Sequence, residues 1–575
     1  MKTKMKKVFC LLLALLMVLS VASCGSKDDG AANDGGAANG TTGGDTGAAD
    51  SGKTDAGDAG ESDKPAADQV FAQTGETWEK MDSSIWTYDT TLNVAMNAEP
   101  VCLVYEYNVM TKPDFNIVRL VHSALFEYDQ NSEIVPMLAE SYEWVDNLHI
   151  RIKLREGVMS YGGNELTADD VLWNLQVGEE NGGAANFTTY FSAAESSVED
   201  KYTIVVGLSK SNPDIFRAFT ETYIVSKADV EALGGLQAAS LNPQCNYGRY
   251  NFKEWVPGQY VLLERNENYW GKDLESAGGY YQYIKLSWIS DSASRVMAVQ
   301  SGNVDMALGL GYADCAGFVG STELTVVGKE SSRCVGLAFN CAEGMLFNDV
   351  NLRSAIYELI DPVVCAQIMY GGYSETTDIF CATTASWYVP GLDPDRAVDV
   401  DKAKEYLAAA GCPDGFSFTL TLEPDDALKQ VAEYLQAQFL EVGINMEINS
   451  PELSDYFNII YAGESQVFMT QSGRFIDVGQ AVQAWDGRIS YASCGGGCGV
   501  QDQEIMDLCD IIYSSIDEAE IKDAYTRIAQ KVFDEHYTIG ICNGVNYILT
   551  ANDITGFVIG QNGNDHLQFM HPVEA

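Results

Sequence analysis

The sequence predicts a mixed α/β protein whose body holds more than one lobe. A strand–helix–strand pattern over residues 416–448 predicts the class, as does an alternating strand followed by a capped helix over residues 149–175. The body begins near Gly75, and the roughly 500 residues that follow are too many for one hydrophobic core. We therefore expect two or more α/β lobes.

The first 23 residues have the pattern of a secretory signal. Four lysines precede the apolar run VFCLLLALLMVLS, which is too short for a comfortable membrane span. The run leads into Val21-Ala22-Ser23-Cys24, which resembles the bacterial lipobox. This resemblance implies cleavage before Cys24 and lipidation of its thiol, so the mature chain would be anchored to the membrane by its acyl chains. An ordinary signal with a chance cysteine is the alternative.

Residues 24–74 are predicted to form a disordered tether. The segment consists mostly of Gly, Ala, Asp, Ser and Thr, which bury too little apolar surface to offset chain entropy. After it, no run of 18 apolar residues follows in the sequence, so no second membrane anchor is expected.

The net charge bears on the class of partner. It is −47 for the whole chain, and the loss of four lysines with residues 1–23 brings it to −51. Such an excess argues against nucleic acid, whose phosphates would be repelled. It mildly favours cationic or zwitterionic solutes, although acidic surfaces more often serve solubility.

Capping residues and apolar spacing predict helices along the body. In DSASRVMAVQSGNVDMAL, Asp291 is a suitable N-cap and Gly302 a C-terminal stop. A short helix in DVDKAKEYLAAAGCPDG ends at Gly411 and Pro413. The segment NDVNLRSAIYELID places five apolar side chains on one helical stripe: Leu352, Ala355, Ile356, Leu359 and Ile360.

Two patterns predict strands. FSFTLTL alternates from Phe416, ALKQVAEYLQAQFLEVG is helical, and INMEI is a second strand; this βαβ unit favours a parallel sheet with a right-handed crossover. HIRIKLREGV also alternates, and the helix TADDVLWNL after it opens with Thr167 as a cap and Asp170 three residues on.

These segments resemble the bacterial extracellular solute-binding proteins of family 5, which are the oligopeptide, dipeptide and nickel receptors of ABC importers. The resemblance covers nearly the whole body and rests on five segments in the family's order and at its distances. They are PMLAESYEWVDNLHIRIKLREGVMSYGGNELTADDVLWNL, YNFKEWVPGQYVLLERNENYWG, SASRVMAVQSGNVDMA, VGLAFNCAEGMLFNDVNLRSAIYELID and DVDKAKEYLAAAGCPDGFSFTLTL.

The resemblance implies a two-lobed periplasmic-binding-protein-like clamshell, of type II and of the large peptide-receptor form with an extra subdomain. Two chain crossings near 335 and 540 would form its hinge. The expected parts are 1–23 signal peptide, 24–74 lipidated cysteine and tether, 75–100, 206–334 and 541–575 lobe I, 101–205 inserted subdomain of lobe I, and 335–540 lobe II.

The resemblance also implies a ligand and its partners. The ligand, with a peptide as the leading expectation, would be held between the lobes, and the closed receptor would dock on the permease subunits of an ABC importer. A separate ATPase would supply the energy for transport. We expect a monomer that uses no cofactor and no metal.

Peptide receptors of the family carry an amine-binding carboxylate in a segment shaped like Gly-Trp-x-x-Asp-Tyr-x-Asp-Pro. Here QSGRFIDVGQAVQAW corresponds to it, with Arg474 at the position of that acid and Asp477 at the later acid. An arginine there disfavours a buried ammonium. Either Asp477 takes over the role, or Arg474 meets a carboxylate or phosphate of a different ligand. An internal ion pair between the two is the structural alternative.

Family position supplies the other ligand-binding candidates. For any one of the aromatic residues, core packing is the stronger alternative. Arg353 is expected to be structural and to hold a helix start against neighbouring backbone. The candidates are Tyr105, Glu106 and Tyr107 in VYEYN, Tyr247 and Arg249 in NYGRY, Asn340 in LAFN, and Trp387, Phe475 and Trp485.

Twelve cysteines follow the lipobox. Their even number suggests disulfides in an exported protein, but a body of this size can stand without them, and Cys334, Cys365 and Cys509 lie in apolar patterns. Cys494 and Cys498 flank three glycines and could form a local disulfide, could remain free thiols in a flexible loop, or could hold a metal. A metal site is disfavoured because four soft ligands are needed and the histidines are scattered.

Other function classes remain open to different degrees. On the same scaffold the ligand could be a nickel chelate or an oligosaccharide, and a surface sensor or adhesin is a further alternative. An extracellular hydrolase is disfavoured, because Gly-x-Ser-x-Gly and His-Glu-x-x-His are absent from the sequence. We therefore expect a binding protein and not an enzyme.

Overall fold

The computed structural model divides the chain into two units, residues 1–62 and 63–575. The predicted signal, Cys24 and the tether fall outside the residues that the structure describes. Those residues all belong to the second unit and are 90–104, 112–129, 133–181, 190–211, 215–274, 278–385, 387–393, 396–472, 478–489, 499–558 and 565–572.

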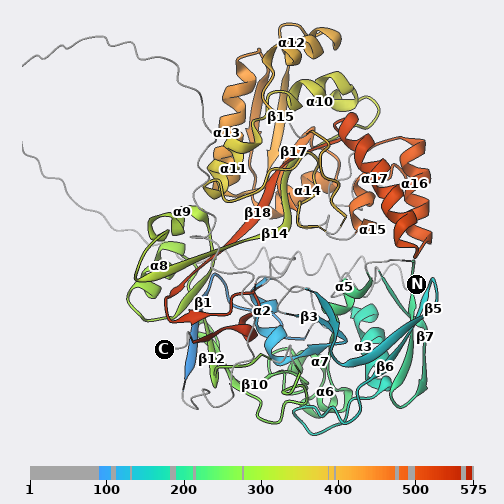
Figure 1. Cartoon of the computed structure of the whole chain (residues 1–575), viewed down its shortest axis with the longest axis vertical. Coiled ribbons are helices and arrows are strands. Elements are labelled where there is room, and N and C mark those ends of the chain that lie inside the picture. The colour runs from blue at the N-terminus through green and yellow to red at the C-terminus, as the bar shows by residue number, and fades with distance from the viewer. Residues whose placement is uncertain are drawn as a thin grey trace, which may run out of the picture. The chain divides into compact units, whose positions relative to one another are not determined.

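A sheet of ten strands runs through the described part of the second unit (Figure 1). It mixes parallel pairs, such as β1 with β12, and antiparallel pairs, such as β14 with β18. In spatial order its strands are β10 (Tyr250–Val256), β11 (Tyr260–Arg265), β12 (Tyr283–Trp288), β1 (Thr91–Met96), β13 (Met306–Leu310), β18 (Thr538–Ala551), β14 (Leu324–Phe339), β17 (Val467–Ser472), β15 (Ser417–Leu422) and β16 (Asn445–Asn449).

The βαβ prediction is confirmed. β15 and β16 pair in parallel, with Ser417 opposite Asn445, and α13 (Asp426–Leu440) connects them. The Asp425 carboxylate accepts from the Leu428 N–H and caps the helix. The buried side of the helix is an apolar stripe at helical spacing: Leu428, Val431, Ala432, Leu435 and Phe439.

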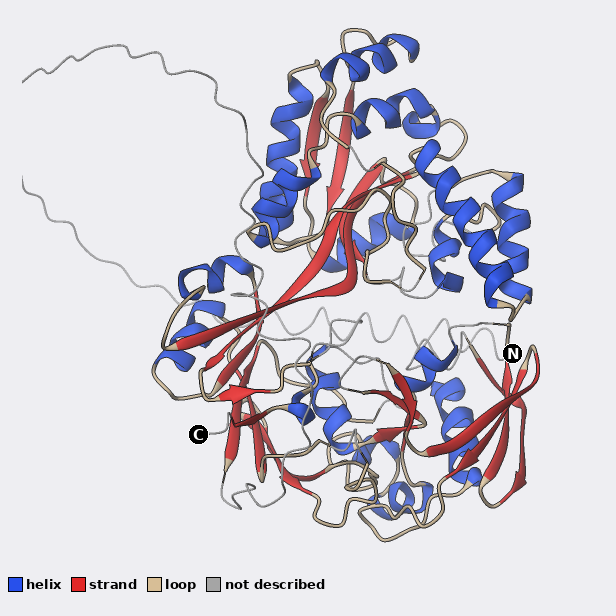
Figure 2. Ribbon diagram, viewed as in Figure 1, coloured by secondary structure: helices blue, strands red, loops and turns tan. Residues whose placement is uncertain are grey.

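A second, four-stranded sheet contains the other predicted strand. Its order is β5 (Ala139–Asp146), β6 (His149–Leu154), β8 (Thr203–Leu208) and β7 (Phe191–Asp200), and all of its pairs are antiparallel. α3 (Ala168–Asn181) begins as predicted, because the Thr167 N–H donates to Asp170 Oδ2 at 3.0 Å while the Asp170 N–H donates back to Thr167 Oγ1 at 3.4 Å. Figure 2 shows this sheet and α3 side by side.

The other predicted helices are also confirmed. Asp291 caps α8 (Ser292–Gln300), and α12 (Val400–Ala409) begins at the Asp399 cap. Gly302 and Gly411 follow these helices with φ of 69° and 77°, a conformation in which glycine is not strained. The apolar stripe predicted around residues 352–360 is buried, but α10 (Val350–Tyr357) ends before the stripe does, and Leu359 and Ile360 lie in the turn beyond it.

The remaining described elements are three pairs of short strands and a set of helices. The strands are β2 (Ser123–Ala124) with β9 (Tyr223–Ile224), β3 (Phe126–Tyr128) with β4 (Ile134–Pro136), and β19 (Ile554–Thr555) with β20 (His571–Pro572). The helices are α2 (Lys112–Val121), α5 (Ile215–Thr220), α6 (Lys227–Leu233), α7 (Leu236–Ala239), α9 (Tyr312–Cys315), η3 (Ala316–Phe318), η4 (Leu346–Asn348), α11 (Pro362–Tyr370), α14 (Leu453–Tyr461), α15 (Val478–Ala481), η6 (Val482–Ala484), α16 (Gln503–Ser514), α17 (Glu518–Asp534) and η7 (Leu567–Phe569).

Two large apolar cores lie along the ten-stranded sheet. One is built mainly from residues 92–308 with 548–570, and the other mainly from residues 334–549. β14 and β18 contribute to both, since Val327 and Ile548 belong to the first core and Val335 and Ile539 to the second. The expected crossings near 335 and 540 therefore lie inside one antiparallel strand pair.

Among the helices that the structure describes, none combines the length and the apolar character needed to span a membrane.

Candidate functional site

Several predicted site residues lie outside the described part of the chain. Their roles in ligand binding, lipidation or cross-linking remain predictions. They are Cys24, Tyr105, Glu106, Tyr107, Arg474, Phe475, Asp477, Cys494 and Cys498.

The structure places Tyr247 and Arg249 in the interior of the first core. The exposed fraction of Tyr247 is 1% and that of Arg249 is 2%. The Arg249 guanidinium forms an ion pair of 2.7 Å with Glu127 on β3, and it also lies over the Tyr269 ring at 5.6 Å. The charge of Arg249 is thus balanced by a buried carboxylate inside the same core.

A polar cluster adjoins this pair and links α2 to the C-terminal segment. Arg119 Nη1 lies 3.2 Å from His566 Nε2, and Gln568 Nε2 lies 3.1 Å from His566 Nδ1. Burial, with the positive charges of Arg119, Arg249 and Lys329, holds the pKa of His566 well below its usual range, so the ring is neutral. A cavity of about 10 Å³ between these groups is just large enough for one water.

Asn340 is fully engaged by neighbouring backbone. Its Nδ2 donates to Gly463 O at 3.1 Å and to Ser465 O at 3.2 Å, and its Oδ1 accepts from the Ala342 N–H. The side chain therefore joins β14 to the turn before β17 in this structure, and both of its donor hydrogens are used there.

Replacement of Asn340 by Ala is expected to lower the free energy of unfolding by about 1–3 kcal/mol, because two buried carbonyls lose their donor. Asn458→Ala on the exposed side of α14 is the matched control and should change it by no more than about 0.5 kcal/mol. Urea unfolding followed by far-UV circular dichroism measures both. Equal midpoints for the two variants would contradict this assignment.

Arg353 has the structural role that was expected. Its Nη1 donates to Phe347 O at 2.7 Å and Asn348 O at 3.1 Å, which holds the chain just before α10, and its Nε donates to Glu535 O at 2.8 Å. With an exposed fraction of 2%, the guanidinium is buried among carbonyl acceptors.

The two candidate tryptophans pack in the second core. Trp485 has no exposed surface in this structure, so its ring is a core side chain here and offers no open wall to a ligand. Trp387 is 8% exposed and also belongs to the core. Core packing, which was the alternative for each aromatic residue, thus describes both.

Ten cysteines of the body lie in the described part of the chain, and none of them is in a disulfide there. Cys334, Cys365 and Cys509 are buried as small apolar side chains, as their patterns predicted, and burial raises the pKa of each thiol. Within the described ranges, no group of three or more His, Cys, Asp or Glu side chains is arranged to hold a metal. Cys494 and Cys498 are not among these ranges.

The β14–β18 pair carries an irregularity beside the expected crossing. Ser331 is opposite Gly544, but the next pair is Cys334 with Asn543, so two residues of β14 bulge out between them. A Cβ on Gly544 would lie 3.0 Å from Arg333 Cβ, so glycine makes room for Arg333. Arg333 Nη2 donates to Gln471 O at 2.9 Å.

Gln471 fixes the end of β17, just before residues 473–477 with their candidates Arg474 and Asp477. Its Nε2 donates to the Tyr370 hydroxyl at 2.7 Å, and its backbone N–H donates to Glu423 Oε2 at 3.2 Å. The bulge of β14 and the C-terminal end of β17 therefore meet at one place. Lys329 and Arg333 were not among the residues predicted from the sequence, although two basic residues inside one mostly buried strand are a readable signal.

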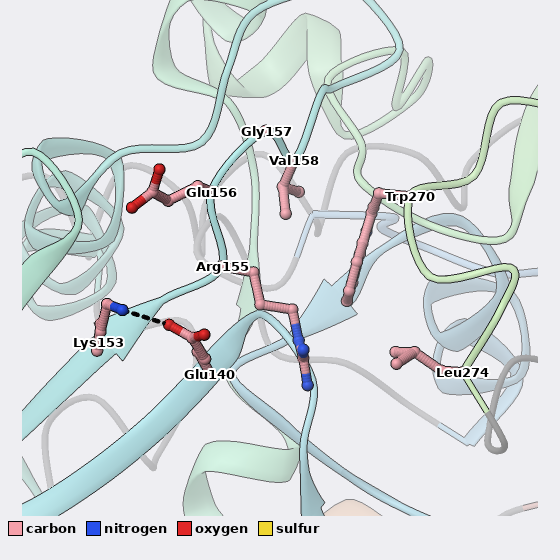
Figure 3. Close-up of a pocket in the computed structure, with 8 residues that line it drawn as sticks. All are labelled: Glu140, Lys153, Arg155, Glu156, Gly157, Val158, Trp270 and Leu274. Atoms are coloured by element: carbon pink, nitrogen blue, oxygen red, sulfur yellow. Dashed lines mark ion pairs between the residues drawn. The ribbon is translucent and has the colours of Figure 1, made fainter.

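A pocket of about 480 Å³ lies elsewhere, between β5, the turn after β6 and the segment after β11 (Figure 3). Its cations are already engaged: Lys153 pairs with Glu140 at 2.6 Å, and Arg155 donates to Met137 O at 2.6 Å. The residues that line it are Glu140, Lys153, Arg155, Glu156, Gly157, Val158, Trp270 and Leu274.

Comparison with known proteins identifies a family model and several curated proteins that match the sequence of this chain. The family model described as bacterial extracellular solute-binding proteins, family 5 Middle, matches residues 133–487. The chain is 26% identical over 373 residues to heme-binding protein A of Haemophilus influenzae, covering 60% of this chain and 67% of that protein. It is 25% identical over 364 residues to the oligopeptide-binding protein AppA of Bacillus subtilis, covering 59% and 65%. The matched part thus spans about two thirds of these relatives.

Solved structures have the same fold. HbpA2 from Haemophilus parasuis matches with a TM-score of 0.73 at 20% identity, covering 84% of this chain and all of that one. AppA from Bacillus subtilis in complex with a nonapeptide matches with a TM-score of 0.65 at 20% identity, covering 84% and 99%. The structure is therefore a mixed α/β protein with the fold of periplasmic binding proteins, as predicted.

Proposed function

Because this chain belongs to the bacterial extracellular solute-binding proteins of family 5, we propose that it captures a solute between two lobes and delivers it to the permease of an ABC importer. The observation that carries the proposal is the β14–β18 pair, which is shared by two separate apolar cores. β14, with 16 residues, and β18, with 14, run from one core into the other, and a strand pair of this kind can bend while the cores move as units.

A peptide is the proposed solute. The relatives include an oligopeptide-binding protein, and one solved neighbour holds a nonapeptide. Other relatives are named for heme and for glutathione, so these two belong in any ligand panel beside nickel chelates and oligosaccharides. The proposed lobe I consists of residues 75–100, 206–334 and 541–575, with residues 101–205 as a subdomain inserted in it. The proposed lobe II consists of residues 335–540. The protein would act as a binding protein, without turnover of its solute.

Thermal unfolding of the full chain with a ligand panel tests this function. The panel holds di- to hexapeptides, the same peptides with blocked amino termini, glutathione, heme, nickel–histidine and oligosaccharides. A bound solute at 100 times its dissociation constant adds about 2.7 kcal/mol of stability, which a melting curve resolves. Stabilisation by free but not by blocked peptides supports amino-terminus recognition and makes Asp477→Asn the next variant. If none of these solutes stabilises the chain, and none copurifies with it in native mass spectrometry, capture of a solute is refuted.

Membrane anchoring through Cys24 is a separate part of the proposal. It is supported by the lipobox pattern Val21-Ala22-Ser23-Cys24 and the tether after it. Cys24→Ser should release the protein into the medium, whereas the parent chain should partition into detergent and carry the mass of acyl chains. Retention of the variant in the membrane fraction would refute the anchor. A surface sensor would bind solute equally well, but uptake of labelled solute would then persist when the chain is deleted.

A further inference from the structure

Two cations on β14, Lys329 and Arg333, have no carboxylate partner among the described residues, although the protein is rich in acidic side chains. The chain has 82 acidic and 35 basic side chains, yet Lys329 and Arg333 form no ion pair with any residue that the structure describes. Both are half-buried. A half-buried charge without a counter-charge loses hydration without compensation, so it disfavours the free folded protein.

Lys329 and Arg333 lie on the same face of the strand pair. Lys329 is opposite Asn546 and Ser331 is opposite Gly544, so Lys329 and Ser331 share one face by alternation. The bulge keeps Arg333 on that face as well, since a Cβ on Gly544 would meet both Arg333 Cβ and Ser331 Oγ. Four residues of strand separate the Cα atoms of Lys329 and Arg333 by at most about 13 Å.

One hydrogen bond orients the Arg333 guanidinium, and another of its N–H groups has no acceptor among the described residues. Its Nη2 donates to Gln471 O at 2.9 Å, while its Nε is buried and has no acceptor among the described residues. Gln471 is itself fixed by the Tyr370 hydroxyl at 2.7 Å. A guanidinium that is oriented by one backbone carbonyl and keeps a free N–H is suited to receive an oxyanion.

Lys329 extends the positive charge toward the first core. Burial lowers the pKa of Lys329, as expected for an ammonium that loses water without gaining an acceptor. Its charge also lowers the pKa of buried His566, after the effects of burial, Arg119 and Arg249. Lys329 and Arg333 therefore place two positive charges on one face of β14.

We propose that Lys329 and Arg333 bind acidic groups of the transported solute, which is therefore an anionic molecule with carboxylate or phosphate groups. This inference rests on the proposed function and specifies the solute class for the same site. Cations that form no ion pair with the described residues disfavour the free protein, and they gain partners when the solute binds.

Titration calorimetry on the full chain tests the inference with defined probes. These are tetrapeptides with two glutamates, the matched peptides with two glutamines, each with a free or an amidated carboxy terminus, and citrate and inorganic phosphate. The glutamate peptides are expected to bind at least about tenfold more tightly than their glutamine counterparts. The amidated peptides separate the terminal carboxylate from the side chains, and phosphate separates phosphate from carboxylate recognition.

Lys329→Met and Arg333→Met are each expected to remove about tenfold of that preference and to leave neutral peptides within about twofold. Arg333→Lys keeps the positive charge, so it shows whether a loss of binding in Arg333→Met comes from the lost charge or from misfolding. Lys522→Met is the matched control, because Lys522 is exposed on α17 and forms no ion pair with the described residues. Without solute, Lys329→Met should melt at a higher temperature than the parent, a sign that a merely structural lysine would not give.

Three outcomes overturn the inference: equal affinity for glutamate and glutamine peptides, an undiminished preference in both Met variants, or no binding of any anionic probe. Binding of neutral peptides by the parent and both variants alike leaves the proposed function intact. The proposed function itself fails only when the broader solute panel and native mass spectrometry also find nothing bound.

Discussion

Replacement of Glu127 by Gln is expected to lower the free energy of unfolding by about 3–5 kcal/mol, because it removes the buried carboxylate that pairs with Arg249 inside the first core. The two groups lie 2.7 Å apart, with exposed side-chain fractions of 11% for Glu127 and 2% for Arg249. Guanidinium chloride screens charges, so urea unfolding is the measurement of choice.

An exposed ion pair of the same sheet region provides the control. Lys253 and Glu264 lie 3.2 Å apart with 43% and 37% of their side chains exposed, so Glu264→Gln should cost about 1 kcal/mol or less. The double variant Glu127→Gln, Arg249→Met should recover much of the loss, since a neutral pair removes the buried charge altogether. Similar losses for Glu127→Gln and Glu264→Gln would show that the buried charge is solvated from elsewhere.

Phe347→Ala is expected to cost about 3–5 kcal/mol, because it opens a cavity in the second core. The ring has no exposed surface and packs against three other phenylalanines, with centroid distances of 4.8 Å to Phe339, 5.3 Å to Phe418 and 6.0 Å to Phe416. Aromatic pairs at these separations add to the area that each ring buries.

Two further substitutions serve as controls for the loss of stability expected in Phe347→Ala. Phe347→Leu keeps most of the volume and should cost less than about 1.5 kcal/mol. Phe457→Ala removes a ring from the open side of α14, where 39% of the side chain is exposed, and should cost about 1 kcal/mol or less. Urea midpoints for all three variants are needed, and the prediction fails where Phe347→Ala unfolds no earlier than Phe457→Ala.

Local signals in the sequence predicted the local elements well. Asp291 and Asp399 cap helices because a carboxylate one residue before an amphipathic run satisfies free N–H groups, whatever surrounds it. The β15–α13–β16 unit was equally readable, since period and length identify each of its parts. Arg353 was also assigned correctly, because a basic residue in an apolar helical stripe has to find acceptors close by.

The order of the large sheet could not be predicted in this way. β14 and β18 pair although about 200 residues separate them, and both are buried on each face along most of their length, so alternation gives no register. The burial of Trp485 and the use of both Asn340 donors depend on elements that approach from elsewhere in the chain. The bulge at Arg333 likewise exists only relative to its partner strand.

The position of β18 has a consequence for how the chain reaches its native state. Although β18 comprises residues 538–551, it lies between β13 and β14 in the sheet. β13 pairs with β1 on its other side and β14 pairs with β17, but almost the whole polypeptide must be synthesised before either strand gains β18 beside it. Until then, both present unpaired backbone groups of the kind that seed aggregation, and the late long-range pairing slows folding.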